Sequence, residues 1–156
     1  MIILLDIDGV LVTTPSWRKV ELHADGFMEF NEMAAKNLAR ILAQTNASIV
    51  LTTTHRINYS DSEWVALLRT RGINAPSISR INNVNSIEEM ADRAAEISAW
   101  IATHGFEERF VILDDDLSLH GLAAEIKKRC MLTKPLIGLD TEATEKAIGI
   151  LHDTLG

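Results

Sequence analysis

The sequence predicts an α/β fold, a three-layer sandwich around a central, mostly parallel sheet. Three short, continuous hydrophobic runs rich in β-branched residues, 2–6, 48–52 and 110–114, are typical of strands buried on both faces of such a sheet. Segments with helical spacing of apolar residues separate these runs, and strands that alternate with helices build this architecture. With 156 residues and no repeat or linker, we expect a single domain over 1–156.

Four segments carry apolar residues on one helical face. In the second and third, a serine stands three residues before a glutamate, which predicts a capping box at the start, and a glycine follows at the end. Asp140 or Thr141 introduces the fourth segment as its N-cap. Two further runs, 72–74 and 130–132, are weaker strand candidates. The four helical segments are 31–45, 60–72, 86–105 and about 142–155.

The composition limits the classes of protein to consider. A formal net charge of −7 argues against broad, non-specific binding of nucleic acid, which depends on phosphate neutralisation, but it leaves room for a small basic site. The single cysteine, Cys130, excludes an intrachain disulfide and fits a reducing compartment. The apolar run 2–5 is too short for a signal peptide, and no stretch approaches the length of a membrane span. We therefore expect a cytoplasmic protein without a membrane partner.

Each of the three strong strands ends in a cluster of polar residues. Because the carboxyl ends of the strands form the binding crevice of an open α/β sheet, residues far apart in the chain should meet there. Packing alone does not explain why three strands deliver carboxylates or hydroxyls to one edge. The clusters are Asp6 with Asp8, Thr52 to Thr54, and Asp114 to Asp116.

Each cluster has a simpler interpretation beside the functional one. Asp6 and Asp8 lie on the same side of an extended chain, where a hard cation such as Mg²⁺ would relieve their repulsion, but Asp8 followed by glycine is also good turn chemistry. Three aspartates at 114–116, directly after a hydrophobic strand, favour metal binding over a solvated charge run or a helix cap. The threonines taken alone indicate no more than β-propensity.

Together the clusters resemble the signature of the haloacid dehalogenase (HAD) superfamily. They supply DIDGV after the first strand, a threonine at the end of the second and ILDD at the end of a later strand, so that the resemblance spans 2–115. A looser similarity, in LTTTHR, RAAEISAWI, VILDDD and GLD, is to the small HAD domains of RNA-repair proteins. The resemblance implies a HAD-like, Rossmann-type fold and a phosphatase that uses Mg²⁺ as its cofactor.

The resemblance also implies roles for the aspartates. Asp6 would be the nucleophile that becomes an aspartyl phosphate, and Asp8 would be the general acid and base. Asp6 and the backbone carbonyl of Asp8 would also be metal ligands, and Gly9 would turn the backbone beside the substrate. Asp114 and Asp115 would hold Mg²⁺, with either of them in direct contact with the ion.

The same resemblance implies a hydroxyl that binds the phosphoryl group and a cation that stabilises its negative charge. Thr52 would hydrogen-bond a phosphoryl oxygen, with Thr53 as the alternative register in the substrate site. The family's usual lysine is missing, because no lysine lies between these threonines and the ILDD motif. Arg93 is our candidate to replace it, with a solvated helix residue as the alternative; Arg56 is the next candidate, or else binds substrate. His55 is interpreted as a structural or rim residue.

The segments between motifs leave little room for a lid. We expect the segment of about 10–30 to form a β-hairpin flap, and neither it nor 55–93 is long enough for a full cap domain beside its own helix and strand. An open site suits a phosphate on a large substrate, such as a nucleic-acid end or a protein, and a nucleotide is the alternative. In the flap, Trp17 with Arg18 and Lys19 would stack on a base and contact phosphate, or Trp17 would pack the flap onto the body.

Two classes of function follow. The leading hypothesis is a Mg²⁺-dependent phosphohydrolase that acts through an aspartyl phosphate on Asp6, on a small or macromolecular substrate. The alternative is a non-catalytic HAD-fold binding or regulatory module, which the missing lysine favours and the intact pair of Asp6 and Asp8 disfavours. A protein that only binds Mg²⁺ or Ca²⁺ is a third interpretation.

Overall fold

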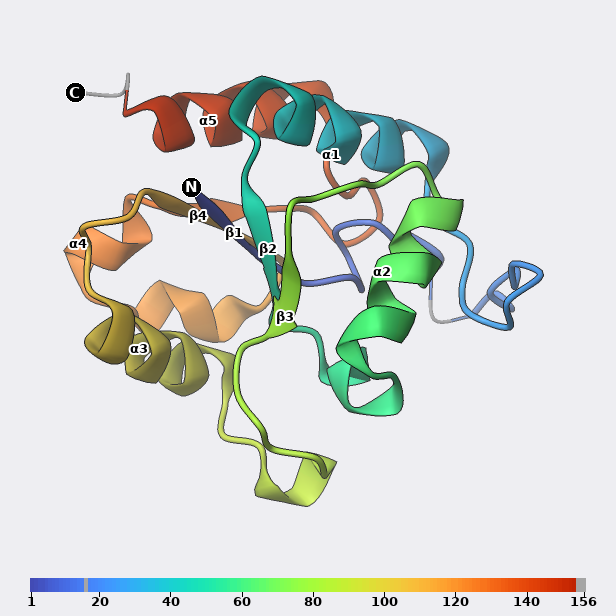
Figure 1. Ribbon diagram of the computed structural model, residues 1–156, viewed down its shortest axis with the longest axis horizontal. Coiled ribbons are helices and arrows are strands. Elements are labelled where there is room, and N and C mark those ends of the chain that lie inside the picture. The colour runs from blue at the N-terminus through green and yellow to red at the C-terminus, as the bar shows by residue number, and fades with distance from the viewer. Residues whose placement is uncertain (16, 154–156) are drawn as a thin grey trace.

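The computed structural model describes residues 1–15 and 17–153, which build an α/β fold around one parallel sheet. The sheet has five strands in the order β3-β2-β1-β4-β5, and every neighbouring pair is parallel (Figure 1). This arrangement confirms the α/β fold class predicted from the sequence. The strands are β1 (Ile2–Leu5), β2 (Ser48–Leu51), β3 (Ile78–Arg80), β4 (Phe110–Asp114) and β5 (Cys130–Leu132).

Of the two weaker strand candidates, 130–132 is confirmed as β5, whereas 72–74 is wrong. Gly72 adopts a left-handed backbone with φ of 79°, and the N–H of Ile73 then donates to the carbonyl of Leu68 at 3.0 Å. The segment therefore ends a helix, and the strand β3 follows only at Ile78. The short apolar run did not distinguish a hydrophobic helix end from a strand, because both bury an isoleucine.

The four predicted helices begin and end close to the expected positions, with one exception, and the short helix α4 was not predicted. Ser60 and Glu63 form the predicted capping box, and Asp140 is the N-cap of the last helix, whose expected end near 155 lies outside the described residues. The helices are α1 (Glu32–Thr45), α2 (Asp61–Thr70), α3 (Arg93–His104), α4 (Ala124–Lys127) and α5 (Thr141–His152).

The exception is α3, which was predicted to begin at Ser86. Ser86 makes no side-chain cap bond, and only a single 3₁₀ turn follows it, at Ile87–Glu89. The helix begins at Arg93, because the carboxylate of Asp92 accepts a hydrogen bond from the N–H of Ala95 at 2.7 Å and so acts as the N-cap. As a result, Arg93 is the first residue of the helix and lies at its N-terminal end.

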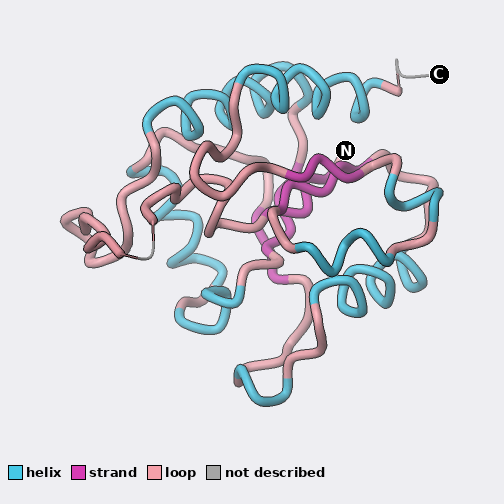
Figure 2. The backbone as a smooth tube through the Cα atoms, turned by 180° about the vertical axis from the view of Figure 1, so that it is seen from behind, coloured by secondary structure: helices cyan, strands magenta, loops and turns pink. Residues whose placement is uncertain are grey.

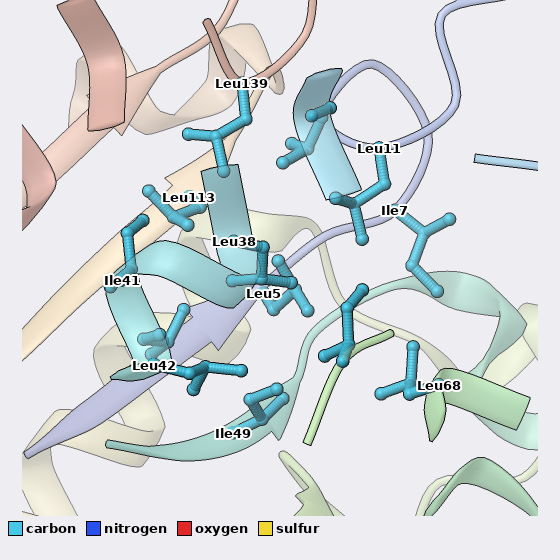
Figure 3. Close-up of a cluster of buried hydrophobic side chains, with 14 of the residues drawn as sticks. Leu5, Ile7, Leu11, Leu38, Ile41, Leu42, Ile49, Leu68, Leu113 and Leu139 are labelled. Carbon is cyan, nitrogen blue, oxygen red and sulfur yellow. The ribbon is translucent and has the colours of Figure 1, made fainter. Parts of the chain in front are cut away.

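Helices cover both faces of the sheet, so that the molecule has three layers (Figure 2). Alternate strand residues point to opposite faces: Ile3 and Leu5 join a core with α1, α2 and α5, and Leu4 joins a second core with α3 and α4. Figure 3 shows the first core, in which Leu38 from α1 and Leu139 before α5 lie over the strands. The burial of the centres of β1, β2 and β4 explains why these three strands appear in the sequence as continuous hydrophobic runs.

The expected flap contains a minimal hairpin. The N–H of Glu29 donates to the carbonyl of Glu21 at 2.9 Å, and a turn at Gly26, with φ of 84°, joins the two sides. Within the described residues, no helix combines the length and the apolar character that crossing a membrane would require.

Candidate active site

The candidate site lies where the order of the strands reverses, between β1 and β4. The strand pairing continues one residue beyond β1, since the N–H of Asp6 donates to the carbonyl of Leu113 at 3.0 Å. Asp6 therefore stands at the carboxyl edge next to Asp114, the last residue of β4. This edge is the usual place for a ligand in an open α/β sheet.

Three carboxylates gather at this edge. Asp6, Asp114 and Asp115 each offer an oxygen, and these oxygens lie within 4.8 Å of one another. Asp114 is fully buried and Asp6 is 4% exposed. Burial and the neighbouring charge of Asp114 raise the pKa of Asp6 well above its usual range, and the same two causes raise the pKa of Asp115. We call these three residues the acidic cluster.

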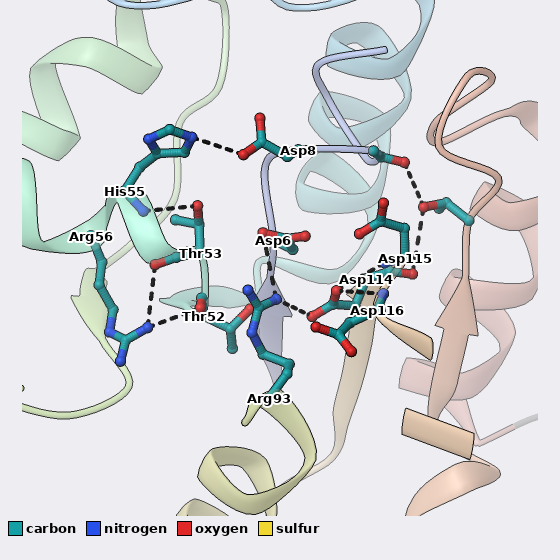
Figure 4. A network of polar contacts seen from close by, with 12 residues as sticks. Asp6, Asp8, Thr52, Thr53, His55, Arg56, Arg93, Asp114, Asp115 and Asp116 are labelled. Atoms are coloured by element: carbon teal, nitrogen blue, oxygen red, sulfur yellow. Dashed lines mark hydrogen bonds and ion pairs between the residues drawn. The ribbon is translucent and has the colours of Figure 1, made fainter. Parts of the chain in front are cut away.

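Within residues 1–15 and 17–153, one cation, Arg93, makes ion pairs with the acidic cluster. Nη1 of Arg93 lies 2.5 Å from Oδ2 of Asp114 and 3.5 Å from Oδ1 of Asp6 (Figure 4). Burial by itself would lower the pKa of Arg93, but the charges of Asp6 and Asp114 outweigh it and raise this pKa. Three carboxylates against one guanidinium leave the site with an excess of negative charge.

The two neighbouring aspartates of β4 differ in their partners. Oδ1 of Asp114 accepts the backbone N–H groups of Asp115 and Asp116, at 2.8 and 3.0 Å, and its Oδ2 faces Arg93, so both of its oxygens are engaged. Asp115 is half-buried and lies against Gly9, where a Cβ atom would stand 2.0 Å from Oδ2 of Asp115. Gly9 also has φ of 77°, so a side chain at this position would displace the carboxylate.

The two buried threonines after β2 are not equivalent. Oγ1 of Thr53 accepts the N–H of His55 at 3.2 Å and caps the 3₁₀ turn Thr54–Asn58. Oγ1 of Thr52 has no hydrogen-bond partner among the described residues, although its side chain is fully buried. An unpaired buried hydroxyl costs free energy, so Thr52 is the threonine that has a free bond to give to a ligand.

Arg56 does not face the acidic cluster. Its guanidinium is fully buried, with Nη2 2.5 Å from Oε2 of Glu96 in α3 and Nη1 donating to the carbonyls of Thr52 and Thr53. Asn82 donates to the same Glu96 oxygen at 2.9 Å. Because the guanidinium of Arg56 has no exposed surface, a substrate could not contact it. The structure therefore does not support the expected contact between Arg56 and a substrate.

Asp8 also stands apart from the acidic cluster. Its side chain is 56% exposed and Oδ2 lies 2.8 Å from Nε2 of His55 (Figure 4). From the sequence, His55 was interpreted as a structural or rim residue, and its position directly after the threonines was the signal that could have marked it as part of the site. Thr133, whose Oγ1 donates to the carbonyl of Gly9 at 2.7 Å, was missed as well, because 124 positions separate the two residues.

The tip of the flap is open to solvent. Trp17 is 78% exposed, which contradicts the alternative that it packs the flap onto the body. Arg18 and Lys19 beside it are exposed as well.

The candidate residues lie in a stretch of the chain that matches a known family of domains. The model of the family described as "HAD domain in Swiss Army Knife RNA repair proteins" matches residues 2–144. The chain belongs to this family. No curated protein and no solved structure matches it. The matched range contains every candidate residue of the HAD domain from Asp6 to Asp115, and the membership supports a phosphohydrolase-type role.

The chemistry of the donor set fits Mg²⁺. The ligands of the acidic cluster are all carboxylate oxygens, which hard divalent cations prefer. Burial and the nearby charge of Asp114 raise the pKa values of Asp6 and Asp115, and a bound cation would stabilise the charged form of both carboxylates.

Proposed function

We propose that this HAD domain is a Mg²⁺-dependent phosphohydrolase that cleaves phosphomonoesters through an aspartyl phosphate on Asp6. The observation that carries the proposal is the buried Asp6 carboxylate, held between the other two acidic residues and Arg93. A carboxylate nucleophile, an oxygen-rich cation site and a guanidinium in one place are the parts that phosphoryl transfer requires.

Asp6 and Asp115 would hold the ion, with Asp114 beside them. When bound, Mg²⁺ supplies positive charge that lets an anionic phosphate approach the carboxylates. Asp115 is the better candidate for direct contact, because both oxygens of Asp114 already have partners.

The remaining steps belong to the side chains. An oxygen of Asp6 attacks phosphorus, the bond to the leaving oxygen breaks, and Asp8 gives that oxygen its proton. Asp8 then takes a proton from water, whose oxygen attacks the phosphorus and releases phosphate and free Asp6. Arg93 and the unpaired hydroxyl of Thr52 would donate hydrogen bonds to the phosphoryl oxygens.

The substrate we propose is a nucleotide or a nucleic-acid end that carries a phosphate. The family description refers to RNA-repair proteins, and the exposed Trp17 with Arg18 and Lys19 offers stacking and charge on a protein that is otherwise acidic. Phosphate release from oligonucleotides with a 3′- or 5′-phosphate, compared with release from mononucleotides, identifies the better substrate.

The first test is the release of phosphate from 4-nitrophenyl phosphate with and without Mg²⁺. Asp6→Asn keeps the shape of the side chain but removes the nucleophile, so we expect a loss of about four orders of magnitude in kcat. Asp153→Asn, an exposed aspartate after α5, is the matched control and should keep full activity. Turnover that persists in folded Asp6→Asn protein contradicts the mechanism, and a folded native protein that binds Mg²⁺ without turnover supports a binding module instead.

A further inference from the structure

Asp8 has a fixed backbone but a side chain with little support. The N–H of Gly9 donates to the carbonyl of Val12 at 2.8 Å, and the N–H of Val12 donates to the carbonyl of Ile7 at 3.0 Å, so a tight loop holds the main chain. The carboxylate itself is more than half exposed. Among the described residues, its one side-chain hydrogen bond is the contact with His55. Without this bond the carboxylate would be free to occupy several rotamers.

His55, by contrast, is held on several sides. Its backbone N–H donates to Oγ1 of Thr53, which places the residue in the first turn of the 3₁₀ helix. Its ring meets the ring of Phe27 edge-to-face, with centroids 5.4 Å apart and planes at 84°. The side chain is 27% exposed, with Nε2 directed to Asp8 (Figure 4).

The ring that supports His55 is itself anchored. Phe27 is buried, and it packs edge-to-face on Trp64 of α2 at 5.5 Å between centroids. Arg71, after the end of α2, donates to the carbonyl of Phe27 at 3.2 Å and binds both carboxylate oxygens of Asp25. A rigid path therefore runs from α2 through the flap to the imidazole.

We propose that His55 is a positioning residue that holds the carboxyl of Asp8 over the leaving group. This inference rests on the proposed function, in which the proton of Asp8 passes to the leaving oxygen as its bond to phosphorus breaks. His55 engages Oδ2, which leaves Oδ1 free to face the reacting atoms. Fixing one rotamer of an otherwise loose acid increases the fraction of molecules that are ready to transfer the proton.

Two substrates of nearly equal size can distinguish a loss of positioning of the Asp8 acid from a nonspecific disturbance of the active site. The 4-nitrophenolate of 4-nitrophenyl phosphate leaves without a proton, whereas the more basic phenolate of phenyl phosphate needs one. The value of kcat/KM reports the first phosphoryl transfer alone, so the later activation of water by Asp8 does not enter. A defect in the acid therefore lowers kcat/KM for phenyl phosphate much more than for the nitro compound.

The variants are His55→Ala and His55→Gln, with His104→Ala as control, because His104 is a histidine that stacks on Trp100 at the far end of α3. We expect His55→Ala to lower kcat/KM about tenfold or more for phenyl phosphate and less than about threefold for 4-nitrophenyl phosphate. His55→Gln, which keeps a side-chain N–H at a similar reach, should recover most of the loss, and His104→Ala should change neither value.

Equal losses on both substrates, or a glutamine variant no better than alanine, would overturn the role of His55 and leave the proposed function standing. A native protein that shows no Asp6-dependent turnover of either ester would overturn both proposals.

Discussion

Two arginines, the buried Arg56 and the half-buried Arg93, lie on either side of Thr52 and differ in their surroundings (Figure 4). Arg56 is matched by one carboxylate, Glu96, and its terminal nitrogens also bond Asn82 and two backbone carbonyls. Arg93 faces the acidic cluster, in which carboxylates outnumber it. The first arrangement is closed and electrically balanced, and the second is unbalanced.

This difference separates a structural ion pair from a candidate site. The Arg56–Glu96 pair ties the end of β2 to α3, the same helix that carries Arg93 at its start. It thereby links the segment after β2 that carries Thr52 to the helix that carries Arg93. The acidic cluster has more carboxylates than Arg93 can pair, and the hydroxyl of Thr52 has no partner among the described residues, which is why we propose a cation and a phosphate as its ligands. Both arginines were candidates from the sequence, and burial with a matched partner distinguishes them.

The largest expected effect is on stability, at the balanced pair. Arg56→Met leaves Glu96 buried without its cation, which should cost about 3–5 kcal/mol in the free energy of unfolding. Urea denaturation measures this value. The double variant Arg56→Met/Glu96→Leu removes both charges and should recover most of the loss; a single variant as stable as the native protein would show that the pair is not a structural element.

The second effect is on activity, at the unbalanced cluster. Arg93→Ala removes the guanidinium beside Asp6 and should lower kcat for 4-nitrophenyl phosphate about a hundredfold to a thousandfold. Arg93→Lys should retain part of the activity, since it keeps a point charge without the planar donors. Arg69→Ala, on the exposed side of α2, is the control that should keep full activity. If Arg93→Ala remains fully active, the arginine does not replace the missing lysine.

The smallest expected effect is on the stability of the protein, at a third and partly exposed ion pair, Asp25 with Arg71. The hydrogen bond from Arg71 holds the pKa of Asp25 below its usual range, so the pair stabilises the protein when Asp25 is ionised. Asp25→Asn should cost about 1 kcal/mol at pH 7. The difference from the native protein should shrink as the pH falls below about 4, the ordinary carboxyl pKa, because protonation removes the native advantage. A difference in urea midpoints that stays constant from pH 7 to pH 3 would contradict this.

Much of the fold could be predicted because its signals are local. The continuous hydrophobic runs marked β1, β2 and β4, and the capping box at Ser60 marked the start of α2. The predictions for 72–74 and for the start of α3 were wrong because the same local pattern is compatible with two structures. Ile73 is buried at a helix end rather than in a strand, and the serine and glutamate at 86–89 produce one 3₁₀ turn rather than a helix start.

The sequence by itself determined the α/β class, the parallel strands and the delivery of Asp6, Thr52 and Asp114 to the ends of strands. These follow from the continuous hydrophobic runs of the strands and the 3.6-residue period of the helices, which neighbouring residues encode. Only the tertiary structure decided which hydroxyl stays unpaired, which arginine meets the acidic cluster and that His55 meets Asp8. Those outcomes depend on contacts between residues that are far apart in the chain, such as His55 with Asp8 across 47 positions and Arg93 with Asp114 across 21. No local pattern encodes such pairings, because they arise only when strands and helices pack.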